Sequence, residues 1–451
     1  MTFRAIIGLL VLLAATHAQA QNCDLKLVTR VDMLPLENRM EVPVSINGIP
    51  KLLLLDTGGV VSQLSPDAVK DLKLAFHETG GRIYDASGIY SHGMVIANNL
   101  TLGALTAKSL HLMISPENLG VSDGLLSSDL LVRYDVDVDF GTGKLSYFSP
   151  DHCPGKVVYW HTETVAEVPL TLREGSKFLV EVRLDGKPFN ALVDTGATRS
   201  FISMPVAREI FGLTQDSPGM TPAGDVNGDP RLFSYLYKFS NLTFEGVTVS
   251  NPAILLIPDR LAGSTIEAGS YVASAGVKLP ELVLGMDVMK HLHMYFAFNE
   301  KKLYVSAAAP APPEVVVPGQ SQSLTMLDKA ITLSPENATL LDERCFRRGI
   351  ENIKLDGALV DCEASLRSSP AYPNPRGSKG LVLYRLGRYQ EALDIYNSVL
   401  SKYPKFAASL YMRGQTKRKL GDATGAAADI TAAKALQADV NKVFNNAGIA
   451  D

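Results

Sequence analysis

The sequence has little that would suit a nucleic-acid-binding, membrane-spanning or nucleotide-dependent protein. Its 43 Lys and Arg nearly balance its 47 Asp and Glu, and no basic stripe alternates with aromatic residues, so nucleic acid is not an expected partner. No apolar stretch reaches the length of a membrane span. The sequence has no phosphate-binding loop, dinucleotide fingerprint or Gly-x-Ser-x-Gly elbow. No cofactor and no metal site are therefore expected.

The N-terminus has the pattern of a secretory signal peptide. Arg4 precedes an apolar run from Ala5 to Ala15, and Ala18-Gln19-Ala20 offers small residues where a signal peptidase cuts. We therefore expect residues 1–20 to be a signal peptide and the protein to be exported. A lipoprotein is a weaker alternative, because the residues before Cys23 lack the apolar pattern that precedes a lipidated cysteine.

Cysteine is scarce, with four residues in 451. Two disulfides would suit an oxidising compartment, and the sequence allows three pairings. A bond between Cys23 and Cys153 would tie together the two ends of one segment. Cys345 and Cys362 lie in a helical region where a helix hairpin could join them, and buried thiols are an equal alternative for this pair.

A proline- and alanine-rich stretch separates two kinds of sequence. Residues 307–323 cannot build a core and are expected to form a semi-rigid linker. Before the linker, short apolar runs alternate with Asn-Gly, Asp-Gly and Gly-Gly turns, a pattern typical of an all-β unit. After it, residues 324–451 are expected to be all-α.

The helical part repeats every 34 residues, as Ala358, Ala392 and Ala426 show. Its clearest copy reads "GLVLYRLGRYQEALDIYNSVLSKYP", with Gly380 and Tyr396 at a small and an aromatic packing position. Residues 325–440 thereby resemble the tetratricopeptide repeat. That resemblance implies stacked helix hairpins and a role in binding a protein partner; a merely stabilising appendage is the alternative.

The β part is duplicated. "INGIPKLLLLDTGGVVS" aligns without a gap with "LDGKPFNALVDTGATRS", which places Asp56 over Asp194 at an offset of 138 residues. Two later segments match in the same order, one of them pairing Asp129 with Asp287. The offsets indicate an insertion of about sixteen residues in the second copy before Leu284. We therefore expect two homologous lobes, over residues 21–154 and 155–306.

Each copy has a strand, a tight turn and a second strand that runs into Asp-Thr-Gly. This arrangement resembles the pepsin and retropepsin clan of aspartic proteases, over about residues 30–306. The resemblance implies a two-lobed acid-protease barrel domain with Asp56 and Asp194 as catalytic residues. It also implies that Thr57 and Thr195 hydrogen-bond across the lobe interface.

The physical logic of such a pair is independent of the family. Two adjacent carboxylates share a proton, so that one is anionic and the other protonated near neutrality. The anion can activate a water molecule, and the acid can hydrogen-bond to the peptide carbonyl that is attacked. Gly58 and Gly196 are expected to let the backbone turn tightly behind each carboxylate and to offer amides to it.

Three positions depart from the pepsin pattern. Gly59 and Ala197 stand where pepsin-like enzymes have Ser or Thr, so neither aspartate gains a hydroxyl hydrogen bond, and the pair is expected to titrate higher than in pepsin. Activity at mildly acidic to neutral pH follows from this. In the second lobe Val283-Leu284-Gly285 matches the family's second element, whereas the first lobe has Ser127 in place of that glycine.

A hairpin over the substrate is expected at residues 80–96, with Tyr84 or Tyr90 facing the substrate and a tip between Asp85 and Gly88. An ordinary surface hairpin is the alternative. The second lobe has an equivalent at residues 224–237.

Three alternating acids, Asp135, Asp137 and Asp139, could suggest a cation site, but alternation along a strand favours a solvated face. The pair of His291 and His293 has the same interpretation, because no Cys or Glu cluster accompanies it.

The sequence as a whole predicts an aspartic endopeptidase that acts on a peptide or protein substrate. A catalytically inactive peptide-binding or scaffold protein is the alternative, distinguished by whether the two aspartates still cleave. Export and this combination of domains favour the periplasm over full secretion.

Overall fold

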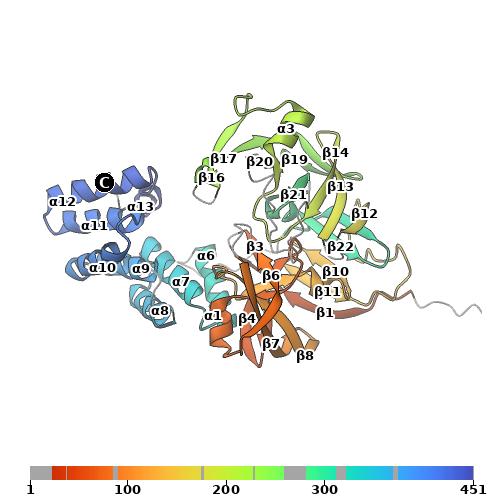
Figure 1. Ribbon diagram of the computed structural model, residues 1–451, viewed down its shortest axis with the longest axis horizontal. Coiled ribbons are helices and arrows are strands. Elements are labelled where there is room, and N and C mark those ends of the chain that lie inside the picture. Colours follow the sequence, from red (N-terminus) through yellow and green to blue (C-terminus); the bar gives the residue numbers. More distant parts are fainter. Residues whose placement is uncertain are drawn as a thin grey trace, which may run out of the picture.

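A computed structural model describes residues 23–36, 38–84, 90–173, 177–226, 229–258, 281–310, 321–368 and 374–449. Figure 1 shows two β lobes and an array of helices that extends from the first lobe. The predicted architecture, an all-β two-lobed domain followed by an all-α helical array, is confirmed. The expected signal peptide, residues 1–20, lies outside the described residues, as does most of the expected linker and of the insertion before Leu284.

The first lobe contains eleven of the described strands and two short helices. They are β1 (Leu27–Asp32), β2 (Leu34–Leu36), β3 (Arg39–Ile46), β4 (Ile49–Asp56), β5 (Gln63–Leu64), α1 (Pro66–Asp71), β6 (His77–Tyr84), β7 (Tyr90–Leu102), β8 (Leu105–Ile114), β9 (Gly124–Ser127), α2 (Ser128–Leu131), β10 (Asp135–Asp139) and β11 (Lys144–Phe148).

The second lobe repeats this order. Its described elements are β12 (Ala166–Arg173), β13 (Lys177–Leu184), β14 (Lys187–Val193), β15 (Phe201–Ser203), α3 (Met204–Phe211), β16 (Thr221–Val226), β17 (Asp229–Lys238), β18 (Asn241–Phe244), β19 (Val247–Ser250), β20 (Ala253–Ile257), β21 (Leu282–Leu284), α5 (Met286–Met289), β22 (Leu292–Ala297) and β23 (Lys302–Ala307).

The tight turns that open the two lobes are confirmed. Asn47-Gly48 joins β3 to β4, and Asp185-Gly186 joins β13 to β14. All four turn residues have positive φ, between 45° and 79°, the conformation that a two-residue hairpin matched to strand twist requires. These turns fix the register of β4 and β14, and therefore also the position of the aspartate at the end of each strand.

The lobes are joined by one antiparallel sheet to which both contribute. Strands β1, β11 and β10 of the first lobe continue into β22, β23 and β12 of the second. At the junction, β10 pairs with β22 so that Asp137 lies opposite Tyr295. The apolar side chains of both lobes form one continuous core that includes Val136, Leu145, Phe296 and Leu303. The relative placement of the lobes therefore depends on a shared sheet rather than on a flexible connection.

The helical array has eight described helices. They are α6 (Gln322–Leu333), α7 (Ala338–Glu351), α8 (Leu355–Ser368), α9 (Asn374–Arg385), α10 (Tyr389–Lys402), α11 (Ala407–Lys419), α12 (Ala423–Leu436) and α13 (Lys442–Asn446). A Cβ at Gly380 would lie 2.6 Å from Cζ of Tyr396, and one at Gly414, 34 residues later, 2.7 Å from Cγ1 of Ile430. The repeated small residues thus let paired helices approach closely.

The array is packed against the first lobe, which the linker composition did not predict. Leu324, Leu327 and Ile331 of α6 share a hydrophobic core with Leu36 and Leu52 of the first lobe. Two side chains after α6 extend this contact. Ser334 Oγ donates to Asp123 Oδ2 at 2.8 Å, and Asn337 Nδ2 donates to the Val121 carbonyl at 3.0 Å.

Two disulfides are present, Cys23–Cys153 and Cys345–Cys362. The first joins the start of the first lobe to the segment that leaves it. The second joins α7 to α8. No helix in the described part of the chain is both long and apolar enough to cross a membrane.

Candidate active site

Asp56 and Asp194 lie at equivalent places in the two lobes. Asp56 ends β4, which runs parallel to β9, and Asp194 follows β14, which runs parallel to β21. Both strands end in a run of buried apolar residues, so each aspartate lies at the point where the two lobes meet. The side chains are buried, with exposed fractions of 9% and 7%, and their carboxyl groups share a hydrogen bond.

Each carboxylate is held by two backbone amides of its own loop. Asp56 Oδ1 accepts from the amides of Gly58 at 3.1 Å and Gly59 at 2.9 Å. Asp194 Oδ1 accepts from those of Gly196 at 3.0 Å and Ala197 at 3.1 Å. Because the same atom is held in both lobes, the second oxygen of each group is left for the partner aspartate or a substrate.

Gly58 and Gly196 offer the amides that we expected, and the approach of the opposite lobe gives a further reason for a glycine at each position. Neither is among the glycines with positive φ. Instead, a Cβ on Gly58 would lie 2.3 Å from Cγ of Asp194, and one on Gly196 would lie 2.6 Å from Oδ1 of Asp56. Each glycine therefore makes room for the carboxylate of the opposite lobe.

The two threonines form a reciprocal set of hydrogen bonds across the lobes. The Thr57 amide donates to Thr195 Oγ1 at 3.0 Å, and the Thr195 amide donates to Thr57 Oγ1 at 3.0 Å. Each hydroxyl then donates to the strand before the opposite aspartate, Thr57 to the Val193 carbonyl at 2.7 Å and Thr195 to that of Leu55 at 2.6 Å. All four groups are buried, so the two loops are fixed rigidly to each other.

A second pair of aspartates supports the loops, a role that the sequence alignment did not assign. Ser62 donates to Asp129 Oδ1 through both its amide and its hydroxyl, at 3.0 and 2.7 Å. Ser200 does the same to Asp287, at 2.8 and 2.7 Å. The duplicated sequence contained a signal for this role, since Ser62 aligns with Ser200 and Asp129 with Asp287. The alignment alone does not show which of the aligned polar residues contact each other.

Ser127 occupies the place of Gly285 without disturbing the backbone. The two residues have φ of −103° and −101°, an extended conformation that any residue can adopt. Their amides donate to Ser62 Oγ and Ser200 Oγ at the same distance, 2.9 Å. The first lobe thus keeps the geometry of the second.

The Ser127 hydroxyl is buried and has no hydrogen-bond partner among the described residues. A Cβ on Gly59 would lie 2.6 Å from this oxygen and 2.5 Å from Oδ2 of Asp56. The space of a side chain at position 59 is therefore closed off by Ser127 and Asp56. In the second lobe the arrangement is reversed, with a side chain at Ala197 and none at Gly285.

The electrostatics of the two aspartates differ. Burial raises the pKa of Asp194, the negative charge of Asp56 raises it further, and together they bring it to about 7. Burial also raises the pKa of Asp56, but amide hydrogen bonds, the hydrogen bond from Asp194 and the charge of Arg39 act in the opposite direction. Asp194 is thus the protonated member of the pair and Asp56 the anion.

A hairpin is present at the expected place, formed by β6 and β7, whose register brings Tyr84 opposite Tyr90. Gly88 and the rest of the expected tip, from Asp85 on, lie outside the described residues. In the second lobe β16 and β17 form the equivalent hairpin.

The solvated face predicted for the alternating acids is wrong. Asp135 and Asp137 are buried, with exposed fractions of 0% and 1%, and so is His293. Asp135 is 2.5 Å from His152 Nε2, and Asp137 is 2.6 Å from both His293 Nε2 and Tyr159 Oη. Within the described ranges, no cluster of His, Cys, Asp and Glu could hold a metal ion.

Comparison with known proteins points to one family. Residues 42–130 and 180–288 match a family model described as aspartyl protease, one segment in each lobe. No curated protein matches the chain. Among solved structures, it is similar to an aspartic proteinase from Irpex lacteus, with 14% identity, a TM-score of 0.39, and coverage of 63% of this chain and 98% of that one. The two matched segments contain both aspartate loops, and the β domain is therefore aspartyl-protease-like in each of its lobes.

Proposed function

We propose that this protein is an aspartic endopeptidase. The observation that carries the proposal is the pair of buried carboxyl groups, Asp56 and Asp194, which share a hydrogen bond and are each held by two amides. Burial in a low-dielectric site makes two ionised carboxylates costly, so the pair holds one proton near neutrality. It then contains a base and an acid side by side.

The roles of the two groups follow from their surroundings. Asp56, favoured as the anion by its amides and by Arg39, takes a proton from a water molecule that attacks the peptide carbonyl. Asp194, protonated, donates a hydrogen bond to the carbonyl oxygen as negative charge develops there. The threonine hydrogen bonds keep the two groups in register during the reaction, so little reorganisation is needed.

Digestion of casein by wild type, Asp56→Asn and Asp194→Asn tests this function. Cleavage by wild type and a loss of at least about a thousandfold in both variants is expected, since each removes one half of the acid–base pair. Pepstatin binding is measured in parallel. A wild-type protein that binds pepstatin without cleaving would favour the alternative of an inactive peptide-binding protein, and absence of both would reject the protease.

We further propose that the helical array binds a protein partner and that the protein is exported to the periplasm. Paired helices with a 34-residue repeat support the first proposal. Two disulfides support the second, because such bonds persist in oxidising compartments. Fractionation of the producing cell, with the redox state of Cys345 and Cys362 measured in each fraction, tests the location.

A further inference from the structure

The helical array has a cavity of about 300 Å³ that is partly open to solvent. Residues from five helices surround it, and its walls are largely apolar and aromatic. They include Phe346 of α7, Leu381 of α9, Phe406 before α11, Met412 of α11 and Phe444 of α13. A cavity of this size is large enough for a side chain.

Three polar atoms of this cavity are buried and have no hydrogen-bond partner in the described part of the chain. They are Asp342 Oδ1, Tyr396 Oη and Ser409 Oγ. Tyr396 and Ser409 are almost fully buried, with exposed fractions of 1% and 2%. An unpaired buried polar atom costs about 1–3 kcal/mol. Three of them around one cavity indicate a site that is incomplete without a ligand.

The three atoms converge on one face of α9. A Cβ at Gly377 would lie 3.5 Å from Ser409 Oγ, and one at Gly380 would lie 3.0 Å from Tyr396 Oη. Positions three residues apart on a helix are neighbours on its surface. Asp342 reaches the same face, since its carboxyl group interacts with the hydroxyl of Ser378. The glycine at 377 leaves open the space beside them.

The charge of the site is negative and uncompensated. Burial raises the pKa of Asp342 to about 6, Glu343 adds to the shift and only Ser378 opposes it. Glu343 itself accepts a hydrogen bond from Arg347 Nε at 2.6 Å. A cation entering the cavity would therefore meet a carboxylate that lacks a positive partner.

We propose that this cavity binds a primary ammonium group on an apolar stem, the side chain of a lysine in a protein partner. An ammonium has three donors and no acceptor, which matches three acceptor atoms, whereas a guanidinium would bring five donors. The aromatic walls would bury the methylene stem and can attract the cation by cation–π contact. The proposal rests on the proposed binding role of the array and adds the chemical group that it recognises.

Titration of the full-length protein with n-pentylamine tests the proposal, with pentan-1-ol as the neutral control. The readout is the methyl NMR signal of Met412, which lines the cavity. For a ligand of this size we expect a dissociation constant on the order of 1 mM. Binding of the alcohol should be at least about tenfold weaker. Equal shifts with both compounds, or no shift with the amine, would overturn the proposal.

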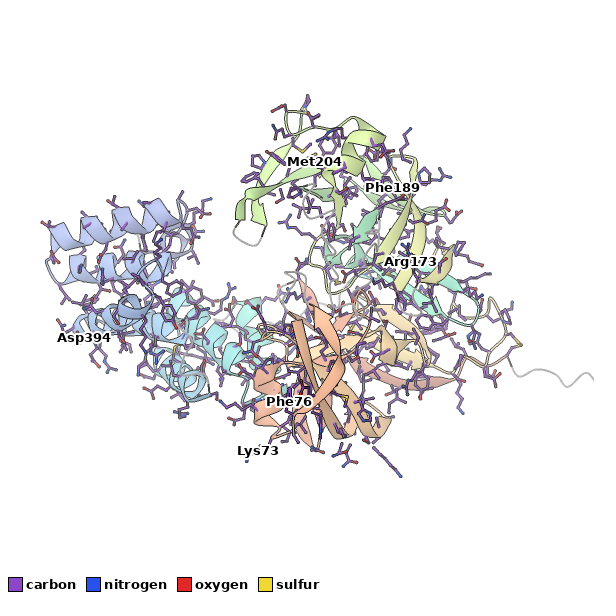
Figure 2. All side chains as sticks on the ribbon, viewed as in Figure 1. Lys73, Phe76, Arg173, Phe189, Met204 and Asp394 are labelled. Atoms are coloured by element: carbon purple, nitrogen blue, oxygen red, sulfur yellow. A yellow bond between two sulfur atoms is a disulfide. The ribbon has the colours of Figure 1, made fainter. Side chains whose placement is uncertain are left out.

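Two variants separate recognition from folding. Asp342→Asn should abolish amine binding yet unfold at the same or a higher temperature, because it removes an unpaired buried charge; a residue with a purely structural role would lose stability instead. Gly377→Leu should fill the cavity and block binding while improving helix propensity. The matched control is Asp394→Asn, an exposed position of α10 at the outer edge of the array in Figure 2.

Casein cleavage by each of these variants is measured alongside binding. It should equal that of wild type, since the cavity lies in the array and not between the catalytic aspartates. Loss of amine binding with full cleavage would support the proposal, and amine binding in a protein that does not cleave would leave it standing while the protease proposal failed. Retained amine binding in Asp342→Asn would reject it.

Discussion

Position 59 is the place where a single added methyl group should most affect the catalytic pair. In Gly59→Ala the new Cβ would lie 2.5 Å from Asp56 Oδ2 and 2.6 Å from Ser127 Oγ, well inside van der Waals contact. Overpacking of this kind costs about 1–3 kcal/mol. Because Asp56 is the nearer group and must rotate, we expect kcat/KM to fall by about a hundredfold, the cost of displacing a reacting group by an ångström.

The second lobe shows how this loss should be repaired. There a side chain at Ala197 coexists with Gly285, so Gly59→Ala combined with Ser127→Gly would give the first lobe the arrangement of the second. Ser127→Gly alone removes a hydroxyl that has no partner among the described residues, and its stability should change by no more than about 1 kcal/mol. The double variant should recover to within about tenfold of wild-type activity.

A double-mutant cycle in kcat/KM and in urea unfolding measures this coupling. The expected interaction energy is about 1–3 kcal/mol, in the direction of rescue. Ala197→Gly is the matched control, because it makes the converse change at the equivalent position of the second lobe, and its effect on activity should be small. Full activity of Gly59→Ala, or a double variant as impaired as the two single changes combined, would show that positions 59 and 127 do not share one space.

Four further outcomes follow from the site and from the array. Asp194→Asn should abolish cleavage yet raise the unfolding temperature above pH 7. Because folding raises the pKa of this carboxyl from 3.8 to about 7, its contribution to stability is complete below pH 3.8 and is lost as pH rises through 7, a cost of a few kcal/mol that the amide avoids. Thermal unfolding at pH 5 and 8 checks the sign. Cleavage by wild type should fall as pH rises through about 7, when Asp194 loses its proton; a rate profile confined to strong acid would contradict this. Thr57→Val leaves the amide of Thr195 and the carbonyl of Val193 unpaired and should cost about 2–4 kcal/mol in urea unfolding, with Thr195→Val equal to it by symmetry. Asn337→Ala should expose the junction between array and first lobe to limited proteolysis, at a cost of about 1–3 kcal/mol, and unchanged proteolysis would mean that the apolar contacts alone hold the junction.

The duplication explains why so much of the catalytic centre could be predicted. An offset shared by two hairpins placed Asp56 and Asp194 in equivalent lobes, and the turn residues fixed the strands before them. The role of the glycines could not be predicted in the same way. The atom that a Cβ at Gly58 would strike belongs to a residue 136 positions away, and only the approach of the two lobes brings them together.

The buried acids of β10 show a different limit. Alternation is a reliable guide to a strand with one solvated face, but Asp135 and Asp137 lie in a sheet covered by the segment after Cys153. Tyr159 donates to Asp137, and Trp160 stacks on His293 with ring centroids 4.0 Å apart. Alternation depends only on the residues of the strand itself. The pattern of that strand does not reveal that a histidine in another strand or loop hydrogen-bonds to each carboxylate, and this hydrogen bond offsets the cost of burying it.

The contact between the helical array and the first lobe couples the stability of one to that of the other. Because Leu324 and Leu327 share a core with Leu36 and Leu52, deleting the helices would expose apolar surface on the lobe. Any loss of activity in a truncated protein would then reflect misfolding of the lobe as much as the loss of a partner. If the array binds a partner as proposed, the same contact gives that partner an influence over the stability of the first lobe. A ligand at a hundred times its dissociation constant adds about 2.7 kcal/mol to the stability of the folded state, and where the array and the first lobe unfold together, that gain extends to the strand that carries Asp56. Abundance of the protein in the cell would then depend on the presence of that partner.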